Sequence, residues 1–140
     1  MNLVIDIGNT RAKAALFETD RLVSRTSWPK VEIADLRAFL TNQKVKRVIL
    51  SSVRRAVDPE MERELENIGH LVRFSHATPV PVQVAYQTPE TLGLDRIAAA
   101  AGALARYPDT NSLVIDAGTC MTFEFVLSGG RYLGGNISPG

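Results

Sequence analysis

The sequence is short of cysteine and of net charge, and each shortage argues against a class of protein. Its single cysteine, Cys120, cannot form an internal disulfide, and no cysteine or histidine cluster at ligand spacing suggests structural zinc. The 16 basic and 15 acidic residues leave a formal charge of +1, so no chain-wide field attracts nucleic acid or a membrane surface. The apolar run ahead of Asp6 is too short for a signal sequence or a membrane span. We therefore expect a cytoplasmic protein with no nucleic-acid or membrane partner.

Strand and helix patterns alternate along the first part of the chain. The expected strands lie at residues 3–7, 12–17, 21–28, 45–53 and 71–74, and the expected helices at 33–40, 59–68 and 94–105. The proline-rich segment 75–91 has no helical period, and we expect an ordered loop that crosses a cleft. This order resembles that of ribonuclease H-like α/β domains, which have a mixed five-stranded sheet with helices on its faces.

A six-residue sequence occurs twice in the chain. Leu-Val-Ile-Asp-Ala-Gly at residues 113–118 repeats Leu-Val-Ile-Asp-Ile-Gly at residues 3–8 with one difference, and a threonine and another strand pattern follow each copy. The repeat predicts a first domain over residues 1–111 and the opening β-meander of a second, duplicated domain over residues 112–140. Because no helices follow this second meander, we expect the chain to be the N-terminal portion of a longer enzyme.

Each copy of the repeat ends an apolar strand with a carboxylate. Asp6 and Asp116 are costly there unless they are solvated, paired or near a cation. The glycine two residues later allows close approach of a ligand, and the following threonine and backbone N–H groups can bind phosphate. For one copy alone, a plain tight hairpin is the better explanation. Two copies favour a pair of phosphate-binding hairpins that face one cleft, with Mg²⁺ near Asp6.

Four further side chains are candidates whose spacing leaves two interpretations open. Asp95 in the first turn of the third helix either interacts with the helix dipole or accepts the proton of an attacking hydroxyl, with Arg96 beside it for an anionic substrate. Tyr86 either closes over a small molecule or packs. Lys13 either contacts a phosphate or is solvated.

Four motifs together resemble those of type III pantothenate kinases. They are Asp-Ile-Gly-Asn-Thr at residues 6–10, Gly-Leu-Asp-Arg at 93–96, Asp-Ala-Gly-Thr at 116–119 and Gly-Gly-Asn-Ile-Ser-Pro-Gly at 134–140. The resemblance implies the fold of actin, Hsp70 and the sugar kinases. It also implies phosphorylation of pantothenate by ATP to 4'-phosphopantothenate, the first step of coenzyme A synthesis, by a homodimer that uses Mg²⁺ and a monovalent cation such as K⁺ or NH4⁺.

The resemblance also implies roles for individual residues. Asp95 matches the catalytic base, and Asp6 and Asp116 match the metal-linked positions. The expected pantothenate-binding residues are Tyr86, Gly93, Leu94, Asp95 and Arg96. The expected ATP-binding residues are Asp6, Ile7, Gly8, Asn9, Thr10, Arg11, Lys13 and Thr119.

The chain departs from the family pattern at two points. Glu124 stands where the family usually has an aspartate, which leaves its local role open. The family's C-terminal half, which closes the nucleotide site and forms part of the partner-subunit wall, does not follow, which leaves open whether these residues are active alone. A sugar kinase or a phosphatase of the same superfamily is an alternative, as is a transcriptional activator of the Baf type, although the near-neutral charge argues against DNA binding.

Overall fold

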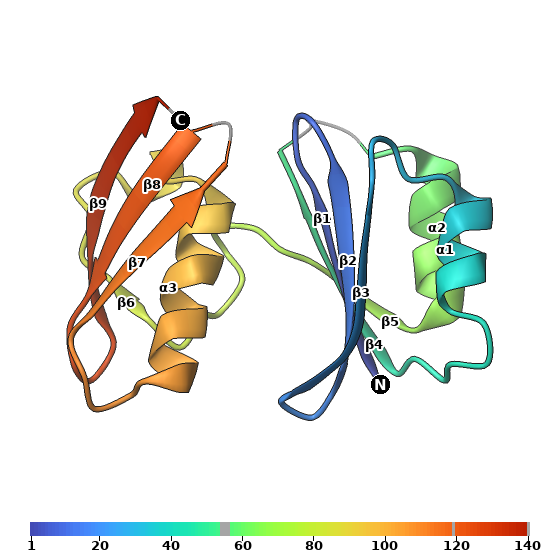
Figure 1. Cartoon of the computed structure of the whole chain (residues 1–140), viewed down its shortest axis with the longest axis horizontal. Helices are drawn as coiled ribbons and strands as arrows, with labels where there is room; N and C mark the ends of the chain where they lie inside the picture. Colours follow the sequence, from blue (N-terminus) through green and yellow to red (C-terminus); the bar gives the residue numbers. More distant parts are fainter. Residues whose placement is uncertain (54–56, 119, 140) are drawn as a thin grey trace. The chain divides into compact units, whose positions relative to one another are not determined.

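The structure, a computed structural model, describes residues 1–53, 57–118 and 120–139. The chain forms two compact units, which we call the first unit (Met1–Ser75) and the second unit (His76–Gly140). Figure 1 shows a sheet with packed helices in the first unit and a sheet with one long helix in the second. No helix in the described part of the chain is long and apolar enough to cross a bilayer.

The first unit is a mixed five-stranded sheet with two helices, as the sequence predicted. Its elements are β1 (Asn2–Ile7), β2 (Ala12–Glu18), β3 (Arg21–Trp28), α1 (Ile33–Phe39), β4 (Arg47–Ser52), α2 (Pro59–Ile68) and β5 (His70–Arg73). The strand order is β3-β2-β1-β4-β5. The β1–β2 and β2–β3 pairs are antiparallel, whereas β1–β4 and β4–β5 are parallel. The helix α1 crosses over from β3 to β4, and α2 crosses over from β4 to β5.

The core of the first unit lies between one face of the sheet and the two helices. Alternate residues of β1, namely Leu3, Ile5 and Ile7, are buried on this face, and Leu36 of α1 and Leu65 of α2 belong to the same cluster. Figure 1 shows α1 and α2 on the same side of the sheet. The opposite face, which carries Asp6, has no such cover from these helices, because side chains alternate along a strand.

The second unit contains the repeated hairpin and the longest helix. Its elements are β6 (Gln83–Val84), the 3₁₀ turn η1 (Pro89–Thr91), α3 (Leu94–Arg106), β7 (Ser112–Ala117), β8 (Cys120–Val126) and β9 (Arg131–Pro139). The strand order is β6-β9-β8-β7. Two residues of the segment 75–91 form an edge strand, because Gln83 and Val84 pair in parallel with Arg131 and Tyr132.

The helix α3 packs on β7 and β8 of the second sheet. Its buried residues Arg96, Ile97 and Ala100 lie on the same side as Glu124 and Val126 of β8. The division between the two compact units falls after residue 75, so α3 belongs to the second unit. The domain assignment from the repeat, residues 1–111 and 112–140, stays a prediction. The repeat marks where the second meander begins, but the packing partners of α3 decide which unit this helix joins.

Candidate active site

The first hairpin turns tightly between β1 and β2. The backbone N–H of Gly8 donates to the carbonyl of Arg11 at 3.0 Å, which leaves Asn9 and Thr10 at the exposed tip. A Cβ at Gly8 would lie 3.2 Å from the Arg11 carbonyl oxygen, so this position suits glycine. Asp6 lies directly opposite Lys13 in the β1–β2 register, and paired residues share a face of the sheet. The hairpin thus combines a carboxylate and an ammonium with an exposed tip.

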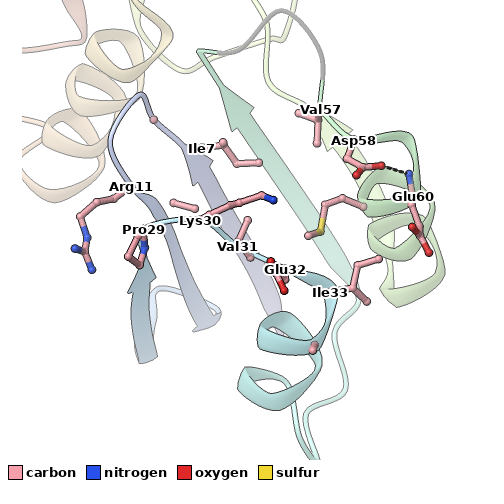
Figure 2. Close-up of a pocket in the computed structure, with 14 residues that line it drawn as sticks. Ile7, Arg11, Pro29, Lys30, Val31, Glu32, Ile33, Val57, Asp58 and Glu60 are labelled. Carbon is pink, nitrogen blue, oxygen red and sulfur yellow. Dashed lines mark hydrogen bonds between the residues drawn. The ribbon is translucent and has the colours of Figure 1, made fainter.

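Two hollows flank this hairpin on opposite faces of the first sheet. A pocket of about 440 Å³ on the helix side is lined by Ile7, Gly8 and Arg11 and by residues at the starts of α1 and α2 (Figure 2). A hollow of about 520 Å³ on the other face is lined by Asp6 and Lys13. The predicted ATP-binding residues are therefore divided between the two faces. The Asp6 hollow suits a phosphate with its cation better, because two cationic side chains, Lys13 and Arg25, line it together with the single carboxylate of Asp6.

Two of the predicted ATP-binding residues have other contacts for their side chains. Ile7 is buried in the core cluster, so only its backbone and the wall of the 440 Å³ pocket remain available to a ligand. The guanidinium of Arg11 donates to Ser27 Oγ, with Nη2 at 3.0 Å and Nε at 3.3 Å. Thr119 lies outside the described residues.

The helix-side pocket contains charged residues that the sequence reasoning missed. Asp58 caps α2 by accepting a hydrogen bond from the backbone N–H of Glu60 at 2.8 Å, as Figure 2 shows. Both residues line the pocket together with Lys30 and Glu32. The Asp58-Pro59 signal predicted the start of a helix, but nothing in the local sequence showed that this start borders the first hairpin.

The described residues contain no group of three or more histidine, cysteine or acidic side chains that could hold a metal. A cation at Asp6 or at Asp116 would therefore be held by a single carboxylate together with water or phosphate oxygens. This donor set fits Mg²⁺, which commonly keeps several waters and takes one or two carboxylates plus substrate phosphates.

The second hairpin is shorter than the first. The backbone N–H of Gly118 donates to the carbonyl of Cys120 at 3.0 Å, two residues along the chain rather than three. Asp116 pairs with Thr122 in the β7–β8 register and is exposed. Figure 1 shows the end of β7 and the start of α3 at the same end of the second unit. Asp116 and the first residues of α3 are therefore at the same end of one packed unit.

The start of α3 presents an exposed carboxylate. Asp95 Oδ1 accepts the backbone N–H of Arg96 at 3.0 Å, which holds the side chain against the first turn. A Cβ at Gly93, the N-cap, would collide with Asp95 Oδ1, so glycine makes room for the carboxylate. Leu94 is half-buried as the first residue of the helix. The start of α3 therefore places the Asp95 carboxylate, which can accept a proton, at an accessible position.

Arg96 is buried against the second sheet rather than extended into solvent. Its side chain is 8% exposed, and it binds Glu124 through two hydrogen bonds, Nε to Oε1 at 2.6 Å and Nη2 to Oε2 at 2.9 Å. The hydroxyl of Tyr132 also donates to Glu124 Oε2. The hydrogen bond to Glu124 raises the pKa of Arg96, and burial followed by the same carboxylate raises the pKa of Tyr132. Glu124 is thus the partner of Arg96.

Tyr86 belongs to the same cluster. Its ring packs on Gly134, where an added Cβ would lie within 3 Å of the ring atoms and where φ is +91°. The backbone N–H of Ala85 donates to the Tyr132 carbonyl at 2.8 Å, which places Tyr86 beside the buried group. The structure therefore brings two predicted substrate contacts, Tyr86 and Arg96, together with Glu124 and Tyr132. A buried glutamate on a strand requires a partner, but the sequence did not reveal that Glu124 is buried.

Comparisons with known proteins match the amino-acid sequence of the chain to one family. A family model described as type III pantothenate kinase matches residues 2–140. Type III pantothenate kinases from Phocaeicola vulgatus and Bacteroides fragilis are 43% and 44% identical over the whole chain, which spans 58% of their length. The relative from Flavobacterium psychrophilum is 36% identical, again with 58% of its length covered.

Solved structures with low sequence identity share the fold. The activator of 2-hydroxyisocaproyl-CoA dehydratase from Clostridium difficile, solved with ADPNP, aligns with a TM-score of 0.57 at 14% identity, over 99% of this chain and 45% of that chain. A structure described as a 2-dehydro-3-deoxygalactonokinase from Sinorhizobium meliloti aligns with a TM-score of 0.55 at 11% identity, over 98% and 53%. These similarities establish the fold of the actin-like ATPases and sugar kinases that the sequence predicted.

Proposed function

The chain belongs to the type III pantothenate kinase family, and on that premise we propose that the whole protein phosphorylates pantothenate with ATP. The product is 4'-phosphopantothenate, and the reaction is the first step of coenzyme A synthesis. The family match over residues 2–140 carries this proposal. The exposed carboxylate of Asp95 beside the Tyr86–Arg96 cluster supports it, because this arrangement offers a proton acceptor next to groups that can bind an anion.

In the proposed reaction, Asp95 accepts the proton of the pantothenate hydroxyl. The hydroxyl oxygen forms a bond to the γ-phosphorus of ATP as the bond to the β–γ bridging oxygen breaks, and ADP leaves. Phosphoryl transfer depends more on position and charge neutralisation than on covalent assistance. Gly93 supports this role because its missing side chain leaves the space that the Asp95 carboxylate occupies.

The remaining residues of the proposal bind the two substrates and their cations. Tyr86, Gly93, Leu94 and Arg96 would bind pantothenate. The first hairpin would bind the ATP phosphates through its tip and through Lys13, with Mg²⁺ at Asp6, and Mg²⁺ there would neutralise phosphate charge. Asp116 would hold a monovalent cation, K⁺ or NH4⁺, with Thr119 contacting the nucleotide. We also propose that the whole protein is a cytoplasmic homodimer.

A substrate panel tests the proposal. The full-length protein is assayed for ADP formation with ATP, Mg²⁺ and K⁺ in the presence of pantothenate, a hexose or inorganic polyphosphate. We expect ADP to form with pantothenate and not with the other two acceptors. Turnover only with a hexose, or hydrolysis of polyphosphate in place of kinase activity, would assign the chain to another activity of the same fold.

A further inference from the structure

The proposed function does not assign a role to two buried polar residues of the second unit. Glu124 on β8 is completely buried, and so is Tyr132 on β9. Glu124 binds the Arg96 guanidinium through both carboxylate oxygens, and Tyr132 donates its hydroxyl to Glu124. Two strands thus fix one arginine side chain that begins on α3.

The pairing with Glu124 uses only one edge of the guanidinium. A guanidinium carries five N–H donors, and the bonds to Glu124 use Nε and Nη2. Within the described ranges no buried side-chain nitrogen or oxygen lacks a hydrogen-bond partner. Neither bond to Glu124 uses Nη1, and the Arg96 side chain keeps 8% of its surface exposed. The edge formed by Nη1 and Nη2 matches the geometry that binds a second carboxylate.

The same residues also fix the position of Tyr86. The carbonyl of Tyr132 accepts the backbone N–H of Ala85, and the parallel β6–β9 pairing continues this contact. The Tyr86 ring then packs on Gly134 of β9. One buried cluster therefore sets the positions of both side chains that the proposed function gives to the substrate.

We infer that Glu124 and Tyr132 are positioning residues, which hold the Arg96 guanidinium so that its remaining donor edge binds the carboxylate of the acceptor substrate. The inference rests on the proposed function, which supplies that carboxylate, because pantothenate is a carboxylic acid. Neither residue touches the substrate in this role. A purely structural ion pair is the competing explanation, and it predicts no selective effect on one substrate.

The test is steady-state kinetics of the full-length enzyme with three variants. Glu124→Gln keeps the side-chain volume but removes the charge that orients Arg96, and Tyr132→Phe keeps the ion pair but removes the hydroxyl donor. We expect Glu124→Gln to raise KM for pantothenate about 10- to 100-fold, with KM for ATP and kcat within about threefold of wild type. We expect Tyr132→Phe to raise the same KM about threefold. Glu124→Asp, which restores a carboxylate, should recover part of the loss.

Glu64→Gln is the matched control. Arg37 binds Glu64 with the same pair of bonds, Nε to Oε1 at 2.7 Å and Nη2 to Oε2 at 2.9 Å, but the pair lies on the first unit, where Arg37 is exposed. This variant should have wild-type kinetics for both substrates.

The possible outcomes are distinguishable. A wild-type enzyme that does not use pantothenate refutes the proposed function itself. With an active wild type, equal changes in both KM values, a selective fall in kcat, or a lower KM for pantothenate in Glu124→Gln would overturn the positioning role. Where Glu124→Gln does not fold, Tyr132→Phe decides: a rise of at least about twofold in KM for pantothenate alone supports the role, and a smaller change overturns it.

Discussion

The strands β1 and β7 have nearly the same sequence, but within these 140 residues helices cover opposite faces of the two strands. Leu3 and Ile5 of β1 are 0% and 1% exposed, whereas Leu113 and Ile115 at the corresponding positions of β7 are 59% and 55% exposed. In the first unit α1 and α2 cover the face that carries Leu3 and Ile5. In the second unit α3 covers the other face, which carries Glu124 and Val126 of β8. The difference lies in the helices, not in the strands.

This comparison shows what a repeated strand can and cannot specify. Leu-Val-Ile is apolar on both faces of a strand, so either face can enter a core. The neighbouring strands adapt to the helix that covers them: Ala15 of β2 occupies the register position that corresponds to Glu124 of β8, and α3 supplies Arg96 as the partner of that glutamate. The second unit thereby buries an ion pair at a position where the first unit has a small apolar residue.

The largest expected difference between the units concerns their arginine–glutamate pairs. Arg96→Met leaves Glu124 buried without its cation, which should destabilise the second unit by about 3–5 kcal/mol. Arg37→Met removes the same bonds from a pair of the first unit whose arginine is exposed, and it should destabilise that unit much less, because solvent screens exposed charges. Hydrogen exchange of the backbone amides, resolved by unit, measures both effects. If the two variants lose equal amide protection, each in its own unit, the buried and exposed pairs do not differ in their contribution to stability.

The second prediction tests which face of β1 and of β7 is buried, by replacing isoleucine with alanine at corresponding positions of the two strands. Ile5→Ala should destabilise the first unit by about 2–5 kcal/mol, because it opens a cavity in the core. Ile115→Ala should change the stability of the second unit of this 140-residue chain by no more than about 0.5 kcal/mol, because Ile115 is exposed. Denaturant unfolding followed by unit-resolved hydrogen exchange compares them. Similar losses would show that the two faces are buried alike.

The third prediction concerns α3, the helix that distinguishes the second unit. A Cβ at Gly93 would displace the Asp95 carboxylate, so Gly93→Ala should lower kcat of the full-length enzyme about tenfold or more. Gly102 in the same helix has no atom within 4 Å of an added Cβ, so Gly102→Ala should leave kcat unchanged. Turnover measurements on both variants separate a local effect at Asp95 from a general effect on the helix. Equal kcat values in the two variants would remove Gly93 from this role.

The smallest expected effects are opposite pH dependences of the two units. The hydrogen bond from Arg37 lowers the pKa of Glu64 below its ordinary value of 4.5, so this stabilisation is present above about pH 4.5 and is lost as the pH falls through the lower folded-state pKa. Burial raises the pKa of Tyr132 above 10.0, so its stabilisation is present below about pH 10 and is lost as the pH rises further. Glu64→Gln should therefore weaken the acid dependence of the first unit.

The alkaline part of this prediction has its own control. Tyr132→Phe should reduce the loss of stability of the second unit above about pH 10, whereas Tyr107→Phe at an exposed position should not. Unfolding measured across pH 3–11 compares the variants. If the second unit of Tyr132→Phe loses as much stability at alkaline pH as the wild type does, Tyr132 is not the cause of that loss.

The sequence predicted most of the fold, because strand and helix periods are local. It predicted the sheet of the first unit, the capped start of α2 and the repeated hairpin. It did not predict β6, whose two residues are too few to show a strand period. It also did not predict the Arg96–Glu124 pair, because the partners are 28 residues apart and burial of Glu124 depends on which face α3 covers. The roles of Asp6, Asp95 and Asp116 stay predictions.

Turnover of the full-length protein with pantothenate, compared between wild type and Asp95→Asn, tests the central claim most directly. The asparagine keeps the shape of the side chain at the start of α3 but cannot accept the hydroxyl proton. We predict that kcat falls by about a hundredfold or more while both KM values stay near those of wild type. A variant that turns over at the wild-type rate would contradict the assignment of Asp95 as the base.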